Sequence, residues 1–158
     1  MPLPHTSRFE DILIMLSYGM VKKPWLYYIL SIVWGLPLTI IGYLLALVLL
    51  PFGKLERVGL TYCLILNRET SWGMSIGTMI FIGRNSVGDR RMLEHEYGHT
   101  FQNAIFGPFT LFLVSIPSAV RFWIRQYMYA HGKTPKTDYD SVWFEGSASK
   151  IGLFTIPF

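Results

Sequence analysis

Cysteine is almost absent from this sequence, and its scarcity excludes folds that are held together by disulfides or by zinc bound to several cysteines. Cys63 is the single cysteine among 158 residues, so the chain can form neither an internal disulfide nor a zinc site built from several cysteines. Charged residues are also scarce, since they make up 15% of the chain, whereas a soluble domain has about 25%. The length fits one domain. With 51% hydrophobic residues, the composition predicts contact with a membrane.

The chain also lacks a continuous basic stripe, which argues against binding to nucleic acid. Its net charge is +4, but the basic residues are scattered, as in Lys22 and Lys23 or Arg121 and Arg125. A nucleic-acid surface would gather them along one face. We therefore expect no nucleic-acid partner. We interpret the charge, together with 16% aromatic residues, as affinity for the anionic headgroups of a lipid bilayer.

An uncharged run predicts a transmembrane segment at residues 25–51. No charged residue occurs from Trp25 to Leu50, and the run is longer than the roughly 20 residues that cross a bilayer as a helix. Gly35 and Pro37 lie within it, so we expect either one kinked helix or a hairpin of two half-helices. The positive-inside rule gives no orientation, because the charges on the two sides are balanced.

The segments on either side of this run have different characters. Residues 1–24 are predicted to be amphipathic, and their order of charged and apolar residues is not that of a cleavable signal peptide. Residues 52–158 are expected to form one domain packed on the membrane. Within that domain, residues 58–66 and 72–82 are rich in β-forming residues and are separated by a polar turn at residues 67–70, which predicts a β-hairpin.

The rest of the domain is predicted to be helical, which makes the expected fold class α+β. The first helix covers residues 90–106, because turn residues that can cap it precede this segment and Gly107 and Pro108 stop it. The following apolar stretch, residues 109–116, is too short to cross a bilayer. We therefore expect the helices before and after this stretch to lie on the same side of the membrane.

Two more helices are predicted near the C-terminus. One runs from a capping residue, Ser118, to about residue 130 and mixes aromatic residues with arginine. It is either a helix at the membrane interface or a core helix with a basic edge. The other covers residues 142–152, with Asp140 or Ser141 as its cap.

The predicted helix at residues 90–106 carries a pattern typical of zinc hydrolases. His95 and His99 are four residues apart, so both lie on one face of the helix and can bind one Zn²⁺. Glu96 is displaced by one position, which lets it reach a water on the ion without ligating the metal. Zinc would lower the pKa of that water towards about 7, and Glu96 would act as the general base.

Catalytic zinc normally has three protein ligands, so a third must come from elsewhere in the chain. The downstream candidates are His131, Asp138, Asp140 and Glu145, while His5 lies before the uncharged run. Glu145 is favoured, because it lies on a predicted helix and is followed by small residues that allow close packing against the His95 helix. Asp138 and Asp140 also suit turn and capping roles.

A hydrogen-bond donor for the reaction's oxyanion, or a contact to the substrate, is expected among three residues. Tyr139, Tyr127 and His131 are the candidates from the C-terminal part of the chain. His131, near the end of its predicted helix, is also suited to capping that helix.

The wider pattern resembles a known group of enzymes. The run from His95 to Gln102, followed later by Trp143, Phe144, Glu145 and Gly146, is similar to the gluzincin type of zincin metallopeptidase. In that group a Glu on a later helix is the third ligand. The pattern also resembles small bacterial membrane-associated proteins grouped with metallopeptidases. This resemblance implies zinc at His95, His99 and Glu145, Glu96 as the base, and a bacterial cell membrane as the location.

Two features of the resemblance concern the surroundings of the metal. Gluzincins often carry an Asp four residues after the Glu ligand to orient a ligand histidine, and here that position is Ser149. The resemblance thus makes Ser149 the candidate residue for orienting a ligand histidine without binding the metal itself. In gluzincins, a strand beside the active-site helix binds extended substrate through its main chain. That strand would correspond to residues 76–82.

Three functions are compatible with these features. The first is a membrane-anchored zinc metallopeptidase that hydrolyses peptide bonds in a peptide or membrane-protein substrate. The second is a membrane scaffold or pseudoenzyme in which the metal is structural or vestigial. The third is an intramembrane zinc protease, which would need an Asp on a long apolar helix, whereas Asp138 and Asp140 lie in a polar segment.

Overall fold

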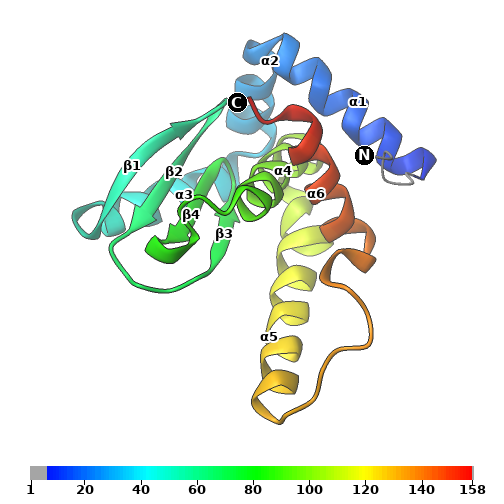
Figure 1. The fold of residues 1–158 in the computed structure, drawn as a ribbon. Helices are drawn as coiled ribbons and strands as arrows, with labels where there is room; N and C mark the ends of the chain where they lie inside the picture. Colours follow the sequence, from blue (N-terminus) through cyan, green and yellow to red (C-terminus); the bar gives the residue numbers. More distant parts are fainter. Residues whose placement is uncertain (1–6, 158) are drawn as a thin grey trace.

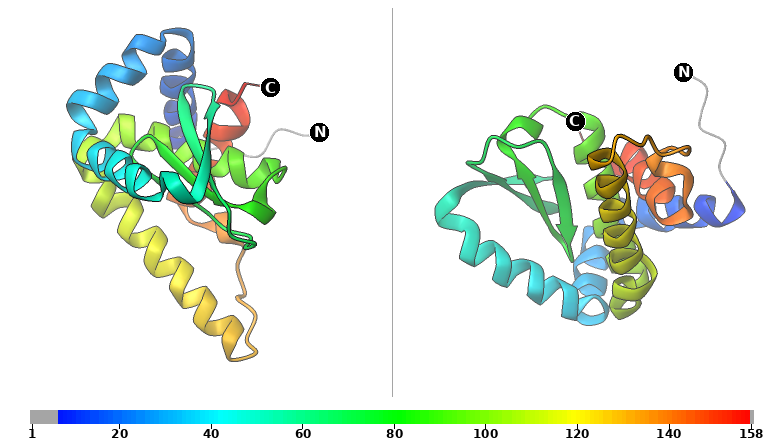
Figure 2. Two further views of the ribbon diagram at one scale, coloured as in Figure 1. Left: turned by 90° about the vertical axis from the view of Figure 1, so that its left-hand side faces the viewer. Right: turned by 90° about the horizontal axis from the view of Figure 1, so that it is seen from below.

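One helix, α4 (Arg90–Phe106), lies between a four-stranded sheet and the helices α6 (Trp143–Thr155) and α1 (Arg8–Lys22) (Figure 1, Figure 2). This is a computed structural model, and it describes residues 7–157. The predicted α+β class is confirmed. His5, one of the candidate ligands, lies outside the described residues.

The sheet is larger than predicted. Its strands are β1 (Gly53–Val58), β2 (Thr61–Leu66), β3 (Gly73–Ile76) and β4 (Met79–Gly83), in the order β1-β2-β4-β3. The prediction of one hairpin from residues 58–66 and 72–82 is therefore wrong. Each of those runs contains a two-residue turn that begins at a glycine with positive φ, 56° at Gly59 and 60° at Gly77. Two hairpins result, joined by the parallel pairing of β2 with β4.

The uncharged run is divided into two helical pieces. The first comprises α2 (Pro24–Ile29) and a π-helical turn, Leu30–Trp34, and the second is α3 (Leu36–Leu49). They meet at Gly35 with a bend of 93°. A bend of 93° is sharper than a kink and falls short of an antiparallel hairpin, so the run is a broken helix that matches neither expected form fully. Within residues 7–157 no helix is by itself long and apolar enough to cross a membrane, although two bent pairs have the length and composition.

A second bend follows α4. Gly107 and Pro108 end this helix as predicted, and a 3₁₀ turn and a π-helical turn lead into α5 (Ile116–Ala130), which is bent by 118° from α4. Ser118 lies inside α5, so the prediction that it caps this helix is wrong. The two bends touch, because the Trp34 indole donates a hydrogen bond of 3.2 Å to the Ile105 carbonyl.

The last helix begins close to its predicted position but without the predicted cap. Its N-cap residue is Val142, whose side chain makes no capping bond, and the segment Tyr139–Ser141 forms a 3₁₀ turn before it. The prediction that Asp140 or Ser141 caps α6 is therefore wrong. This turn leaves the Asp140 side chain available for a contact near the metal-binding residues.

The helices α4 and α6 pack with their backbones almost in contact. A Cβ atom on Gly98 would overlap the Ala148 carbonyl, and one on Gly152 would overlap the Glu94 carbonyl. Only glycine permits this approach. The helix α1 in turn packs on α6, where Lys150 and Glu10 form an ion pair of 2.8 Å. The contact of α4 with α6 positions His95 and His99 opposite Glu145.

Large apolar side chains cover the outer faces of both bent pairs. No residue of α5 is buried, so the interpretation of this helix as a core helix is wrong. The most exposed apolar residues of these segments are Trp25, Ile32, Val33, Leu44, Leu47, Val48, Phe52, Phe109, Phe112, Trp123 and Tyr127. Such continuous apolar surface is unusual on a molecule that water surrounds on every side.

Candidate metal centre

Three side chains from two helices converge on one point. His95 and His99 lie one turn apart on α4, and Glu145 lies in the first turn of α6. The two histidine Nε2 atoms are 3.1 Å apart, and the Glu145 Oε2 atom lies 3.1 Å from Nε2 of His95 and 3.2 Å from Nε2 of His99. Ligands about 2.0 to 2.1 Å from a tetrahedral ion stand about 3.3 Å from one another. The triangle therefore has nearly the size that a zinc ion needs.

The tautomer of His95 is fixed by a hydrogen bond at Nδ1, the ring nitrogen that faces away from the centre. Its Nδ1 atom lies 2.7 Å from the Ser149 hydroxyl oxygen, and that hydroxyl donates a hydrogen bond of 3.0 Å to the Asp140 carboxylate. Since the carboxylate can only accept, the Ser149 oxygen must accept the proton of Nδ1. The Nε2 atom of His95 is thus left with its lone pair pointing into the centre.

The tautomer of His99 is fixed in the same way by Gln102. The Gln102 amide nitrogen donates to the Phe144 carbonyl and the Ser147 hydroxyl, each at 2.8 Å. Its oxygen therefore faces His99 and accepts from Nδ1 at 2.7 Å. Three acceptor atoms, two Nε2 lone pairs and one carboxylate oxygen, now face one another. Such an arrangement is repulsive unless a cation lies among them, so the donor set fits a metal.

Glu145 is fully buried, with 0% of its surface exposed. Burial raises the pKa of this carboxyl group, but hydrogen bonding with the His95 and His99 rings, which the rings donate from Nε2 only in their doubly protonated form, outweighs burial and holds its pKa well below the usual range. A cation bound to the neutral rings would take the place of that positive charge. Its second oxygen, Oε1, is buried without a hydrogen-bond partner among the described residues. A buried carboxylate in this state calls for positive charge beside it.

Glu96 lies beside the centre but outside the triangle of ligand atoms. Its side chain is 7% exposed, and a Cβ atom on Gly73 would stand 3.1 Å from its Cγ atom. The strand next to Glu96 is thus β3. The residues expected to form the substrate-binding strand, 76–82, fall mainly on β4, which lies inside the sheet between β2 and β3. The edge strand beside the active-site helix is therefore Gly73–Ile76, which corrects that expectation.

The structure separates the three candidates for the oxyanion donor. The Tyr139 ring lies 5.9 Å from the His95 ring. Burial, with the negative charges of Glu145 and Glu96, raises the pKa of Tyr139 to about 12, so its hydroxyl keeps its proton at neutral pH and can donate. This is consistent with the role expected of Tyr139.

Tyr127 and His131 do not reach the centre. They lie at the free end of α5, which extends away from α4 and α6 (Figure 1), and they stack on each other with ring centroids 4.1 Å apart. The end of α5, where Tyr127 and His131 lie, is about 15 to 20 Å further along the helix axis than Ser118, which is near the start of this helix. The expectation that either residue contacts the oxyanion is therefore wrong. His131 ends α5 instead, as its alternative role predicts.

Two supporting residues were not foreseen. Gln102 lies three residues after His99 on the same helical face, a spacing that could have identified it. Asp140 was considered as a ligand, a turn residue or a helix cap, but its carboxylate accepts from Ser149 and lies 3.8 Å from Nδ1 of His95. Asp138, the other candidate acid, contributes its carbonyl oxygen to hydrogen bonds with the Arg121 side chain and the Ser141 amide.

Replacing Ser149 with Ala should weaken zinc binding by about 10- to 100-fold, as is typical when a group behind a ligand histidine is removed. The change deletes the acceptor that fixes the tautomer of His95 and leaves the backbone of α6 intact. Competition with a chromophoric chelator would measure the affinity. The matched control is Ser17→Ala, which removes a buried helical hydroxyl from α1. Equal affinities for the two variants would contradict the proposed role of Ser149.

Comparison of the chain with protein-family models, with curated proteins and with solved structures finds no match. The geometry of the three converging side chains is thus the observation on which a functional assignment must rest: His95, His99 and Glu145 form a group that can hold a metal ion.

Proposed function

We propose that this chain is a membrane-attached zinc peptidase. One observation carries the proposal: two histidine Nε2 atoms and a buried carboxylate oxygen meet within 3.2 Å, and hydrogen bonds that place the proton of each neutral ring on Nδ1 leave both Nε2 atoms able to bind a metal. A merely structural zinc site would usually be closed by a fourth protein ligand. Among residues 7–157 the group holds three candidate ligands, which would leave one position open, as in catalytic zinc sites.

The surrounding side chains suit peptide hydrolysis. When bound, zinc supplies an activated water and polarises a substrate carbonyl. Glu96 is the general base that accepts the proton of the attacking water and passes it to the leaving amine. The Tyr139 hydroxyl donates a hydrogen bond to the oxygen that becomes negative in the transition state. These roles divide the work between a buried carboxylate that binds metal, Glu145, and one beside it that moves a proton.

The substrate is an extended peptide or a segment of a membrane protein. All four residues of β3 are in register with β4, and β3 has no second partner strand within residues 7–157. In an antiparallel pair every second residue directs its main-chain N–H and C=O groups away from the partner strand. An extended chain could add to this edge by main-chain pairing. The position of Gly73 against Glu96 would bring such a chain next to the general base.

The membrane attachment is supported by the two bent apolar segments. The pair Pro24–Trp34 and Leu36–Phe52, and the residues from Leu111 along α5, expose large apolar side chains. Trp25 and Trp123, 59% and 69% exposed, are of the type that prefers the boundary between lipid and water. We infer that these segments dip into or cross a bacterial cell membrane and keep the metal centre near its surface.

Metal analysis with chelation tests the proposal. The purified protein should contain close to one zinc ion per chain and cleave a fluorogenic peptide library in detergent. A chelator should abolish cleavage, and added zinc should restore it. Zinc without cleavage would favour a scaffold with a structural metal, and a protein free of zinc that cannot be loaded would refute the metal site itself.

A further inference from the structure

A groove lies between α5 and the loop that returns from it to α6. The cavity has a volume of about 860 Å³, which is within the range of sites that hold small molecules. Its floor is apolar, and cationic side chains stand along its wall and rim. The lining residues that carry the argument are Val120, Ile124, Met128 and Phe144, which are apolar, and Lys133 and Lys136.

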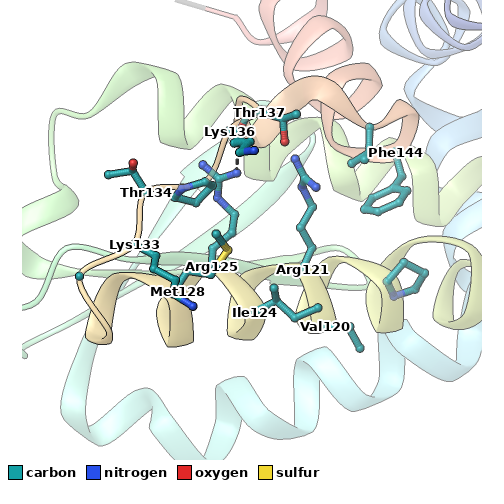
Figure 3. Close-up of a pocket in the computed structure, with 14 residues that line it drawn as sticks. Val120, Arg121, Ile124, Arg125, Met128, Lys133, Thr134, Lys136, Thr137 and Phe144 are labelled. Carbon is teal, nitrogen blue, oxygen red and sulfur yellow. Dashed lines mark hydrogen bonds between the residues drawn. The ribbon is translucent and has the colours of Figure 1, made fainter.

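The charge of the groove has one sign. Arg121 and Arg125 rise from α5 towards the loop, where Lys133 and Lys136 stand (Figure 3). No acidic residue is among the described residues that line the cavity. No ion pair within residues 7–157 involves Lys133 or Lys136, the ion pairs being those of Lys54, Arg90, Lys150, His95 and His99. The occupant that fits is therefore anionic at one end.

The apolar side chains that line the groove favour an occupant that is itself apolar along its length. Ile124 and Val120 are more than half exposed, and contact with an apolar chain would remove this surface from water. A free phosphate ion would fill only a small part of the volume and leave these side chains uncovered. Trp123 and Tyr127 on the same helix are highly exposed, as expected for a helix at a bilayer surface.

We propose that this groove binds one anionic phospholipid, with its phosphate between Lys133 and Lys136 and its acyl chain against Val120, Ile124 and Met128. The inference rests on the membrane attachment proposed above, but it does not depend on the hydrolytic reaction. Lysine and arginine together suit a phosphodiester, since both donate charge-assisted hydrogen bonds to its oxygens.

The groove adjoins the metal centre through the loop that forms its wall. Arg121 donates to the carbonyl oxygens of Asp138 and Tyr139 at 2.7 and 3.1 Å, and Arg125 donates to the Thr137 carbonyl at 2.7 Å. This segment continues into Asp140, which supports His95 through Ser149. A lipid in the groove would thus contact the same arginines that bind the main chain of residues 137–139, directly before Asp140.

Binding of short-chain lipids to the full chain in nonionic detergent tests the proposal. Dihexanoyl phosphatidylglycerol should bind with one equivalent per chain by titration calorimetry, and dihexanoyl phosphatidylcholine at least about 5-fold more weakly. The double change Lys133→Ala and Lys136→Ala should weaken the anionic lipid by about 30-fold, since each lysine near the surface contributes about 5-fold. The same change at Lys22 and Lys23, two exposed lysines outside the groove, should leave affinity within about 2-fold.

Three outcomes would overturn the inference. Equal affinity of the two lipids would show that no headgroup is recognised. Unchanged affinity in the Lys133 and Lys136 variant would place the lipid elsewhere, and inorganic phosphate that displaces the lipid at equal concentration would identify a plain anion site.

A second variant tests the apolar wall of the groove. Ile124 belongs to the apolar side chains that line the groove, and Ile124→Asp puts a negative charge among them. The change should weaken binding of the anionic lipid by about 5-fold or more. Unchanged affinity would contradict the proposed position of the acyl chain. A Glu96→Gln variant should bind the lipid like the unchanged protein, so loss of hydrolysis and loss of the lipid site are separate results.

Discussion

Replacing Glu96 with Gln should lower kcat/KM for peptide cleavage by about 10²- to 10⁴-fold, the usual contribution of a general base, while zinc remains bound. Gln has nearly the same shape but cannot accept the proton of the attacking water. Glu96 lies outside the triangle of ligand atoms, so its loss should not release the metal. Zinc content and peptide cleavage, measured on the same preparation, give the two readouts.

Glu94→Gln is the matched control for this change. Glu94 is also a buried glutamate of α4, 7% exposed like Glu96, but it pairs with Arg90 at 2.7 Å and does not belong to the centre. Its replacement should leave kcat/KM per folded molecule within about 2-fold, because general-base catalysis needs direct reach to the reacting proton. Cleavage by the Glu96 variant at the rate of this control would remove Glu96 from the mechanism.

His99→Ala should abolish stoichiometric zinc binding. It removes one of three ligands, so the loss of affinity should exceed the roughly 10- to 100-fold expected when only a supporting group is deleted. It also removes one of the two imidazole partners of the buried Glu145 carboxylate, which should destabilise the folded protein. Metal analysis after dialysis, with circular dichroism to show that the helices persist, measures both effects.

The control for the histidine variant is His131→Ala. His131 is exposed at the free end of α5 and stacks on Tyr127, so its replacement should change neither zinc content nor cleavage. If His99→Ala retained one zinc per chain, or if His131→Ala lost it, the assignment of ligands would be wrong.

Local signals in the sequence sufficed for the helix that carries the histidines. Asp89 caps α4 through a bond to the Met92 amide, Gly107 ends it, and the spacing of His95 and His99 follows from the helical repeat. Glu145 could be chosen because small residues follow it, and two of them, Gly146 and Ala148, are buried in α6 beside α4 or the loop.

Contacts between distant residues were beyond local signals. His95 and Ser149 are 54 residues apart, and only the packing of α6 on α4 brings them together. The pairing of strands was missed for a different reason. The glycines at positions 59 and 77 start two-residue hairpin turns, which is a recognisable signal. The prediction instead treated each glycine as part of a single strand, because apolar residues surround it. The parallel pairing of β2 with β4 has no local signal at all.

The glycine contacts between α4 and α6 also govern which cations the chain can accept. The donors stand on two helices whose backbones already touch at Gly98 and Gly152, so the helices cannot draw closer, and their mutual packing opposes separation. Calcium would need six to eight oxygens at about 2.3 to 2.6 Å, and magnesium an octahedron of oxygens. In the proposed metal centre, the side chains of His95, His99 and Glu145 would set the number and type of donors, while Gly98 and Gly152 would fix the spacing of those donors without touching the ion.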